Sequence, residues 1–333
     1  LILVMVKKPA DYFDHTDLLD FPGYKGRLGS SNLQEDLRAG KADSSVEQFF
    51  RRGKVAYLFQ RYKDEHELTS LMLCNSTTDT IEGLPDVVQE WIISTHGKLP
   101  EQRTGVNKTA LFYILTKADT CFETGPGKKI EDIWNATLDG RFLTHFGSIH
   151  SSDTKWVDKW TPTEPFKNMF LLRNINIHWN AIMNIDSAKN LETGIREDQK
   201  DHVEKMRNSF INSSLVKKHF NNVEKAFDEF MKLNDGGIEY IKNSLQPVCE
   251  PNLKLDQILN QMRVARDNLY KILEPFYTSG NLDEELKRKK ALFVTMKNFA
   301  GNGKFRARFP ELLSSFSLPV DQLVYLKEDA ERM

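Results

Sequence analysis

Two short polar segments of this chain combine residue types that bind metal ions and nucleotides. D-F-P-G at 20–23 and T-K-A-D at 116–119 each follow an apolar run of strand length. A carboxylate suits a hard cation, which prefers oxygen ligands, and it also accepts hydrogen bonds from a base. Taken singly, each segment is equally typical of plain structure: a Pro-Gly turn for the first and a helix cap for the second.

Taken together, the two segments have the order and spacing of the later nucleotide motifs in P-loop GTPases. In that arrangement Asp20 would hold Mg²⁺ through a water molecule, because this cation keeps much of its hydration shell. Gly23 would present its backbone N–H to the γ-phosphate, where a side chain would block the approach. The polar segment 24–45 would then become ordered around the triphosphate and loosen after hydrolysis.

The second segment would read the base. Asp119 would accept two hydrogen bonds from the guanine edge, and adenine lacks the matching donors. The aliphatic stem of Lys117 would lie along the base plane, and Thr116 would tie the loop to the phosphate-binding loop. The sequence therefore predicts a site for GTP and Mg²⁺.

Several features depart from this pattern. No G-x-x-x-x-G-K-[ST] occurs in the 333 residues, so the chain lacks the anion cradle of a P-loop. Tyr24 follows Gly23 where a water-positioning glutamine would stand, and the catalytic group is not identified. Arg173 and Asn174 occupy the place of the last guanine-binding loop without its signature. Because the chain opens on Leu1, we expect a phosphate-loop segment upstream, and we expect the 333 residues alone to bind nucleotide poorly.

The elements that must position these residues follow from hydrophobic patterning. Strands are expected at 1–6, 16–20, 68–75, 110–119 and 167–174, and helices at 46–67, 84–97 and 130–147. Alternating strands and helices indicate a mostly parallel α/β sheet with helices on both faces, in which ligands bind at the carboxyl ends of strands. Beyond about 190 the chain reads as long amphipathic helices. We therefore predict a GTPase-like domain over 1–180 and an all-helical domain over 181–333.

Composition narrows the class of protein. The net charge of −1 gives no electrostatic case for nucleic acid. The three cysteines show no C-x-x-C spacing and are expected to be buried, reduced thiols of a cytoplasmic protein. Trp156 and Trp160 are expected to pack at the domain edge. A basic run at 287–290 reads as a solvated helix face; contact with a membrane surface is the alternative, and nothing else in the sequence supports it.

Four blocks of sequence carry a resemblance to a known family. They are DLLDFPGYKGR, FFRRGKVAYLFQRYKDEHELTSLMLC, LFYILTKAD and PFKNMFLLRN. Over roughly 10–180 the chain resembles the SrfC-type virulence factors of bacteria, whose N-terminal part is similar to a dynamin-like GTPase domain. The resemblance implies a cytoplasmic nucleotide-binding protein. Carried over by position, it gives Asp20 and Gly23 the metal and γ-phosphate roles, and Thr116, Lys117 and Asp119 the base-reading roles.

Two functions remain open at this point. In the first, the intact protein is a GTPase that hydrolyses the γ-phosphate, and the helical part transmits the nucleotide state or self-associates. In the second, the chain is a non-enzymatic scaffold with a degenerate nucleotide fold, and its helices bind protein partners. A phosphate loop in the complete open reading frame would favour the first.

Overall fold

The computed structural model describes residues 8, 10–21, 42–76, 84–106, 108–123, 129–147, 155–177, 179–276, 282–300 and 310. The chain divides into two compact units, Leu1–Arg266 and Asp267–Met333. This division lies well beyond residue 180, so the helices between residues 200 and 245 belong to the same unit as the sheet. The assignment of 1–180 to a GTPase-like domain stays a prediction.

A three-stranded parallel sheet lies at the centre of the first unit, in the order β1-β2-β3. The strands are β1 (Leu71–Ser76), β2 (Leu111–Thr116) and β3 (Met169–Leu171). The expected strands at 68–75, 110–119 and 167–174 are therefore present, with shorter bounds. β2 is buried along almost its whole length, as expected for a central strand covered on both faces.

The strand expected at 16–20 is not formed. Residues 16–21 have no helical or strand assignment, and Leu18 is 66% exposed. A strand needs a neighbour to satisfy its backbone, and within the described ranges β1 pairs with β2 alone in this sheet. The strand expected at 1–6 lies outside the described residues.

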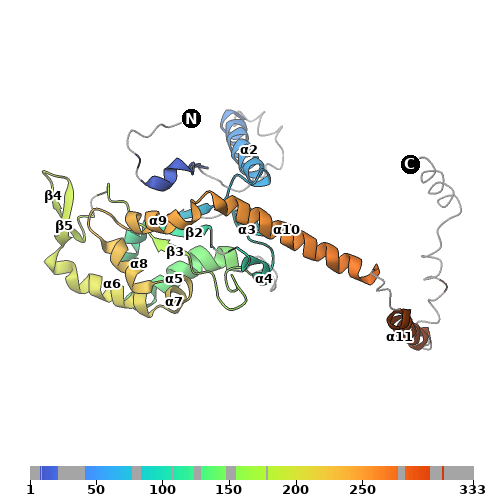
Figure 1. The fold of residues 1–333 in the computed structure, drawn as a ribbon. Helices are drawn as coiled ribbons and strands as arrows, with labels where there is room; N and C mark the ends of the chain where they lie inside the picture. The colour runs from blue at the N-terminus through green and yellow to red at the C-terminus, as the bar shows by residue number, and fades with distance from the viewer. Residues whose placement is uncertain are drawn as a thin grey trace. The chain divides into compact units, whose positions relative to one another are not determined.

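The two faces of the sheet pack against different aromatic groups. On one face Phe170 stacks on Phe112 and contacts Tyr240 of α9 (Ile238–Leu245), with ring centroids 5.8 and 5.3 Å apart. On the other face the ring of Tyr113 meets Phe142 at 4.8 Å. The alternation of side chains along a strand places adjacent residues on opposite faces. Figure 1 shows the sheet with helices on both sides.

The helices of the chain cover most of the remaining described length. The helices before β3 are α2 (Ala42–Asp64), α3 (Leu84–Thr95), α4 (Pro100–Arg103) and α5 (Ile133–Leu138). Those after residue 195 are α6 (Lys200–Asn212), α7 (Ser214–His219), α8 (Val223–Met231), α9 (Ile238–Leu245), α10 (Asn252–Leu273) and α11 (Leu282–Ala300). The helices predicted at 46–67, 84–97 and 130–147 are confirmed within a few residues at their ends.

The region after residue 180 is not entirely helical. An antiparallel hairpin, β4 (Met183–Asp186) and β5 (Leu191–Ile195), precedes α6. Its connection is closed by Asp186 Oδ1, which accepts the N–H of Ala188 at 3.0 Å, and by Asn190 with φ of 56°. An aspartate and an asparagine at a tight turn are the residues that favour such a reversal. The prediction of an all-helical domain over 181–333 is therefore wrong for residues 183–195.

A π-helical turn, Asp139–Gly147, extends α5 beside the carboxyl end of β1. The carbonyl of Arg141 in this turn accepts hydrogen bonds from Asn75 Nδ2 at 3.1 Å and from Tyr113 Oη at 2.9 Å. Side chains that compete for a helix carbonyl widen the local ladder, which explains the departure from α-helical geometry. The turn thus places the Arg141 carbonyl, which accepts both hydrogen bonds, beside the carboxyl end of β1.

The expectations for Trp and Cys residues are met in part. Trp156 and Trp160 are buried, as expected for packing residues. Cys121 and Cys249 are buried thiols outside any disulfide, but Cys74 is exposed on β1. Cys74 was expected to be buried; along β1 it alternates with the buried Leu73 and Asn75, so its side chain lies on the opposite, exposed face of the strand.

Candidate functional site

The loop after β2 begins with a left-handed residue. Lys117 has φ of 54° and ψ of 34°, a conformation that costs a non-glycine residue free energy. Two hydrogen bonds hold the loop: Ala118 N–H donates to the carbonyl of Leu172 at 3.2 Å, and Thr120 Oγ1 donates to the carbonyl of Lys117 at 2.8 Å. The loop is therefore fixed to the segment that follows β3. The left-handed conformation of Lys117, whose side chain is exposed, ends the extended backbone of β2.

Asp119 lies in this loop, at the start of the 3₁₀ turn Ala118–Phe122. Its carboxylate is half-buried, and Oδ1 is inaccessible to solvent without a hydrogen-bond partner in the described part of the chain. Burial raises the pKa of Asp119 above its usual value, while its own backbone N–H and the charge of Arg173 act to lower it. An acceptor left unpaired in a buried position costs about 1–3 kcal/mol. Such a group suits a ligand that brings its own N–H donor.

Thr116 ends β2 and lies opposite Ser76 in the register with β1. Thr116, Lys117 and Asp119 therefore lie at the carboxyl end of the central strand, and their binding roles stay a prediction. That end of a parallel sheet is where ligands bind in open α/β folds.

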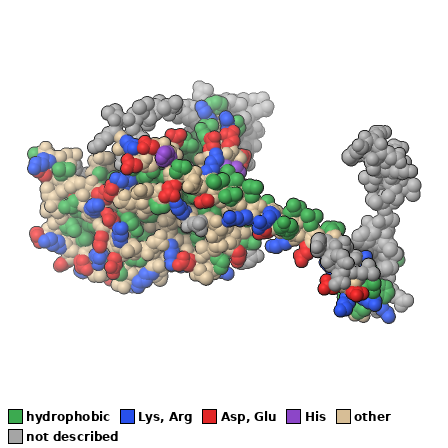
Figure 2. All heavy atoms as spheres, viewed as in Figure 1, with side chains coloured by type: hydrophobic (Ala, Val, Ile, Leu, Met, Phe, Trp, Pro, Cys, Tyr) green, Lys and Arg blue, Asp and Glu red, His purple; other side chains and the backbone are tan. Residues whose placement is uncertain are grey.

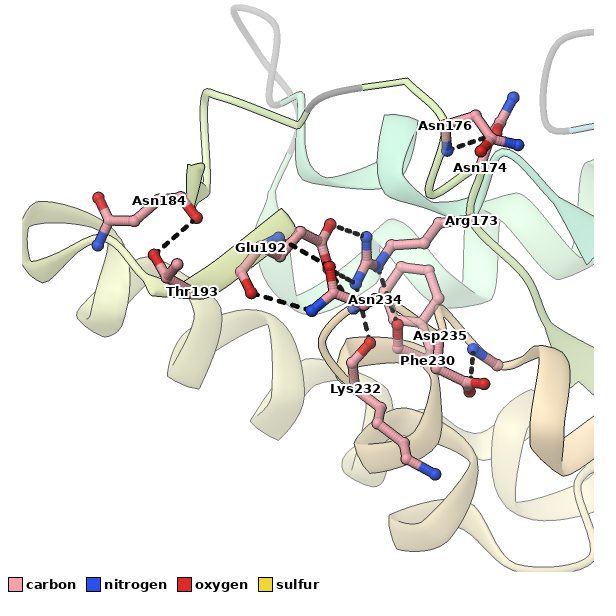
Figure 3. A network of polar contacts seen from close by, with 11 residues as sticks. Arg173, Asn174, Asn176, Asn184, Glu192, Thr193, Phe230, Lys232, Asn234 and Asp235 are labelled. Atoms are coloured by element: carbon pink, nitrogen blue, oxygen red, sulfur yellow. Dashed lines mark hydrogen bonds and ion pairs between the residues drawn. The ribbon is translucent and has the colours of Figure 1, made fainter. Parts of the chain in front are cut away.

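Arg173 directly follows Leu172, whose carbonyl holds the loop after β2, and it is almost completely buried. Its guanidinium forms a bidentate ion pair with Glu192 of β5, with Nη2 to Oε2 at 2.7 Å. It also donates to the carbonyls of Phe230 at 3.1 Å and Lys232 at 3.0 Å. Figure 3 shows the guanidinium between these acceptors. The place expected for the last guanine-binding loop is therefore filled by a structural network.

Asn234 completes the network from the turn between α8 and α9. Its backbone N–H donates to Glu192 Oε2 at 2.8 Å, its Oδ1 accepts the Glu192 backbone N–H at 2.7 Å, and its Nδ2 donates to the Glu192 carbonyl at 3.0 Å (Figure 3). Gly236 and Gly237 follow with φ of 63° and 100°. A Cβ on Gly237 would lie 2.5 Å from the Leu171 carbonyl, so the turn packs directly on the end of β3.

Sequence reasoning missed Glu192 and Asn234 as members of this network. The N-D-G-G run at 234–237 predicts a turn with positive φ, which is the one local signal available. The partner of Arg173 lies 19 residues away on a different element, and no periodicity links the two.

Asp20 lies in the irregular segment 16–21, near β1. Its side chain is exposed, and Phe21 packs its ring 5.4 Å from that of Phe59 in α2. Protein atoms crowd the Cys74 thiol, and this desolvation, followed by the negative charge of Asp20, raises the pKa of Cys74. Asp20 is thus close to the strand next to β2. Gly23 and most of the segment 24–45 lie outside the described residues, except that 42–45 begin α2.

Two searches of the described ranges bear on metal and membrane binding. No group of three or more His, Cys, Asp or Glu side chains that could hold a metal ion occurs there. Mg²⁺ commonly uses one or two carboxylates together with water and phosphate oxygens, so a single exposed carboxylate such as Asp20 is compatible with it. No helix in the same ranges has the length and apolar character to cross a bilayer.

The fold and the site define a mixed α/β protein in which a polar loop with an unpartnered carboxylate follows the central strand of a parallel sheet. Over residues 1–332 the chain matches the family described as "Putative bacterial virulence factor", and it belongs to that family. The family-level resemblance is confirmed by this match, whereas the dynamin-like GTPase part stays a prediction. No curated protein and no solved structure matches the chain.

Proposed function

We propose that the complete protein binds GTP with Mg²⁺ and hydrolyses it as a switch or mechanochemical protein of the dynamin-like type. The observation that carries the proposal is the unpartnered Oδ1 of Asp119 at the end of the central strand. Guanine offers N1–H and a 2-amino group side by side, and a carboxylate offers two acceptors. Adenine presents an acceptor at N1 and no 2-amino group, so it leaves the carboxylate unpaired.

The remaining residues have supporting roles in this proposal. Lys117 supplies an aliphatic stem beside the base, and Thr116 links the base-reading loop to the phosphate side. Asp20 binds Mg²⁺ through water and Gly23 presents its N–H to the γ-phosphate. Bound Mg²⁺ would neutralise charge on the phosphate oxygens. In this proposal the phosphates are held by a G-x-x-x-x-G-K-[ST] loop, a motif that the 333 residues do not contain.

The first test is to read the complete open reading frame for that motif. The second is calorimetric titration of the protein made from it, with GTP, ATP and XTP in the presence of Mg²⁺. Wild type should prefer GTP over ATP by at least tenfold, the discrimination expected when a site leaves a buried polar group unpaired.

Asp119→Asn makes the test specific for the base. An amide offers one acceptor and one donor, which match the N1–H and the 2-carbonyl of xanthine. We expect the affinity of the variant for GTP to fall and its affinity for XTP to rise by a similar factor. Equal affinity of wild type for GTP and ATP, or a variant that does not change its preference, would contradict the role of Asp119.

A second candidate function, a non-enzymatic interaction protein, is favoured by one surface of α10. The buried residues of this helix, Leu253, Gln257 and Asn260, lie on one face. Exposed apolar side chains recur at intervals of three, four or seven residues on the opposite face: Leu255, Leu259, Met262, Leu269 and Leu273. Figure 2 shows green side chains along this helix. Such spacing is typical of helices that pair in coiled coils.

The partner we test for this surface is a second copy of the chain. Light scattering after size exclusion should give a dimer mass that falls to the monomer mass in Leu269→Asp. The control is Lys271→Asp, which changes charge on an exposed position outside the apolar stripe. A wild-type monomer at about 100 μM would contradict the self-association.

A further inference from the structure

Arg173 follows Leu172, whose carbonyl accepts the N–H of Ala118 at 3.2 Å, so the Arg173–Glu192 ion pair begins on the segment that holds the Asp119 loop. Asp119 Oδ1 in this loop is the only carboxylate oxygen among the described residues that is buried without a hydrogen-bond partner. Arg173 is close enough for its charge to act on Asp119. An arginine and an aspartate at such a position would ordinarily pair with each other. Here the guanidinium instead pairs with Glu192.

The geometry shows why Arg173 does not turn to Asp119. Both terminal nitrogens of the guanidinium are engaged by the Glu192 carboxylate, with Nη2 to Oε2 at 2.7 Å. Nε and Nη2 also donate to carbonyls of the α8–α9 segment. The Trp179 ring lies 5.7 Å from the guanidinium carbon and packs against its face. Bidentate pairing and stacking hold a planar group in one orientation.

We propose that Glu192 is a positioning residue for the site: by sequestering Arg173 in a bidentate pair, it keeps Asp119 Oδ1 without a protein partner, so that this oxygen is left to accept an N–H of a ligand. The carboxylates of Glu192 and Asp119 compete for Arg173. The hairpin β4–β5, which carries Glu192, therefore determines whether Arg173 pairs with Asp119. The ligand class rests on the proposed function, but the sequestration does not.

The second support for this proposal is the way the hairpin is fixed. Asn234 makes three hydrogen bonds to Glu192, of which two use the Glu192 backbone. The carboxylate is thus held from both ends, by Arg173 and by the Asn234 backbone N–H. A residue that served only to fill space between the hairpin and the α8–α9 turn would not need this orientation.

The test is titration of the Asp119 carboxyl by carbon-13 NMR in the chain as it stands, with the signal assigned through Asp119→Asn. Glu192→Gln keeps the shape of the side chain but removes the charge that holds Arg173. We expect Arg173 to pair with Asp119 in this variant and to lower the pKa of that carboxyl by about 1–3 units, the usual effect of an adjacent arginine.

Two further variants separate sequestration from structure. Asn234→Gly removes the side-chain tether of the hairpin at a position with φ of 58°, which glycine adopts freely, and leaves the ion pair in place. It should leave the Asp119 titration unchanged. If Glu192→Gln does not fold, Glu192→Asp keeps the buried charge but is one methylene shorter, and it should lower the Asp119 pKa by a smaller amount.

A titration of Asp119 that stays at or above the wild-type value in both Glu192 variants would overturn the proposal. So would a downward shift of equal size in Asn234→Gly, because a loosened hairpin would then be the cause. Nucleotide binding is measured separately on the complete protein. There, Glu192→Gln should weaken GTP at least tenfold and bring the preference for GTP over ITP, which lacks the 2-amino group, close to one. If wild type binds neither nucleotide, the proposed function fails, while the NMR result still decides the role of Glu192.

Discussion

Replacing Arg173 by methionine removes the charge that balances Glu192 and leaves a side chain of similar length. The two side chains are 1% and 5% exposed, so the remaining carboxylate would stay out of water. Breaking a buried pair from one side costs about 3–5 kcal/mol. One backbone N–H from Asn234 still reaches Glu192 at 2.8 Å, which places the expected loss near the lower end, about 3 kcal/mol. In a unit of this size that is a fall in Tm of about 6–12 °C.

The double variant Arg173→Met/Glu192→Met should recover most of this loss, because replacing both charges by apolar groups of similar volume is commonly neutral or stabilising. Urea unfolding followed by circular dichroism gives all three free energies. The matched control is Arg207→Met, which breaks an ion pair to Asp228 whose side chains are 30% and 59% exposed. It should cost less than about 1 kcal/mol. If Arg173→Met lowers the free energy of unfolding by no more than Arg207→Met does, the reasoning is refuted.

Three other outcomes follow from the structure. His96 is fully buried, its Nε2 accepts the Ala110 N–H, and burial lowers its pKa to about 3. Below pH 6.5 the unfolded chain binds a proton at His96 that the folded chain does not bind, so the free energy of unfolding should fall by about 2–3 kcal/mol between pH 6.5 and 4.5. In urea unfolding, His96→Gln should flatten this dependence on pH. Gly237→Ala should destabilise the protein by more than about 1 kcal/mol, because φ is 100° and the new Cβ meets a backbone oxygen. Gly53→Ala in α2, with open space around it, should instead stabilise the protein by about 1 kcal/mol. Thermal unfolding of both variants measures these changes. Asp20→Asn should speed maleimide labelling of Cys74 at pH 7, because removing the negative charge lowers the thiol pKa, and an unchanged rate would mean that Asp20 does not lie beside β1.

The parallel sheet could be read from local patterns alone. Apolar runs such as LFYILT at 111–116 have the length and composition of a buried strand, and helical spacing separates them. The polar T-K-A-D segment therefore had to follow a strand, and the carboxyl end of that strand had to be near a ligand-binding edge. These inferences need contacts between residues close in sequence and one rule about parallel sheets.

Residues 16–20 show where local pattern fails. Their composition favours a strand, but a strand forms only if a partner offers its backbone groups, and β1 pairs with β2 alone in the described part of this sheet. The hairpin β4–β5 was missed for the converse reason, because its exposed face reads like a helix surface, and its carboxylate on Glu192 finds its partner elsewhere.

The sequence by itself determined the three strands of the parallel sheet, the helices between them, the family, and the identity of the carboxylate that follows the central strand, because each depends on runs of neighbouring residues. Only the tertiary structure decided that Arg173 pairs with Glu192 and that Asp119 Oδ1 lacks a hydrogen-bond partner among the described residues. The physical reason is that an ion pair depends on distance in space and on exclusion of water, and neither is recorded in the spacing of residues along a chain.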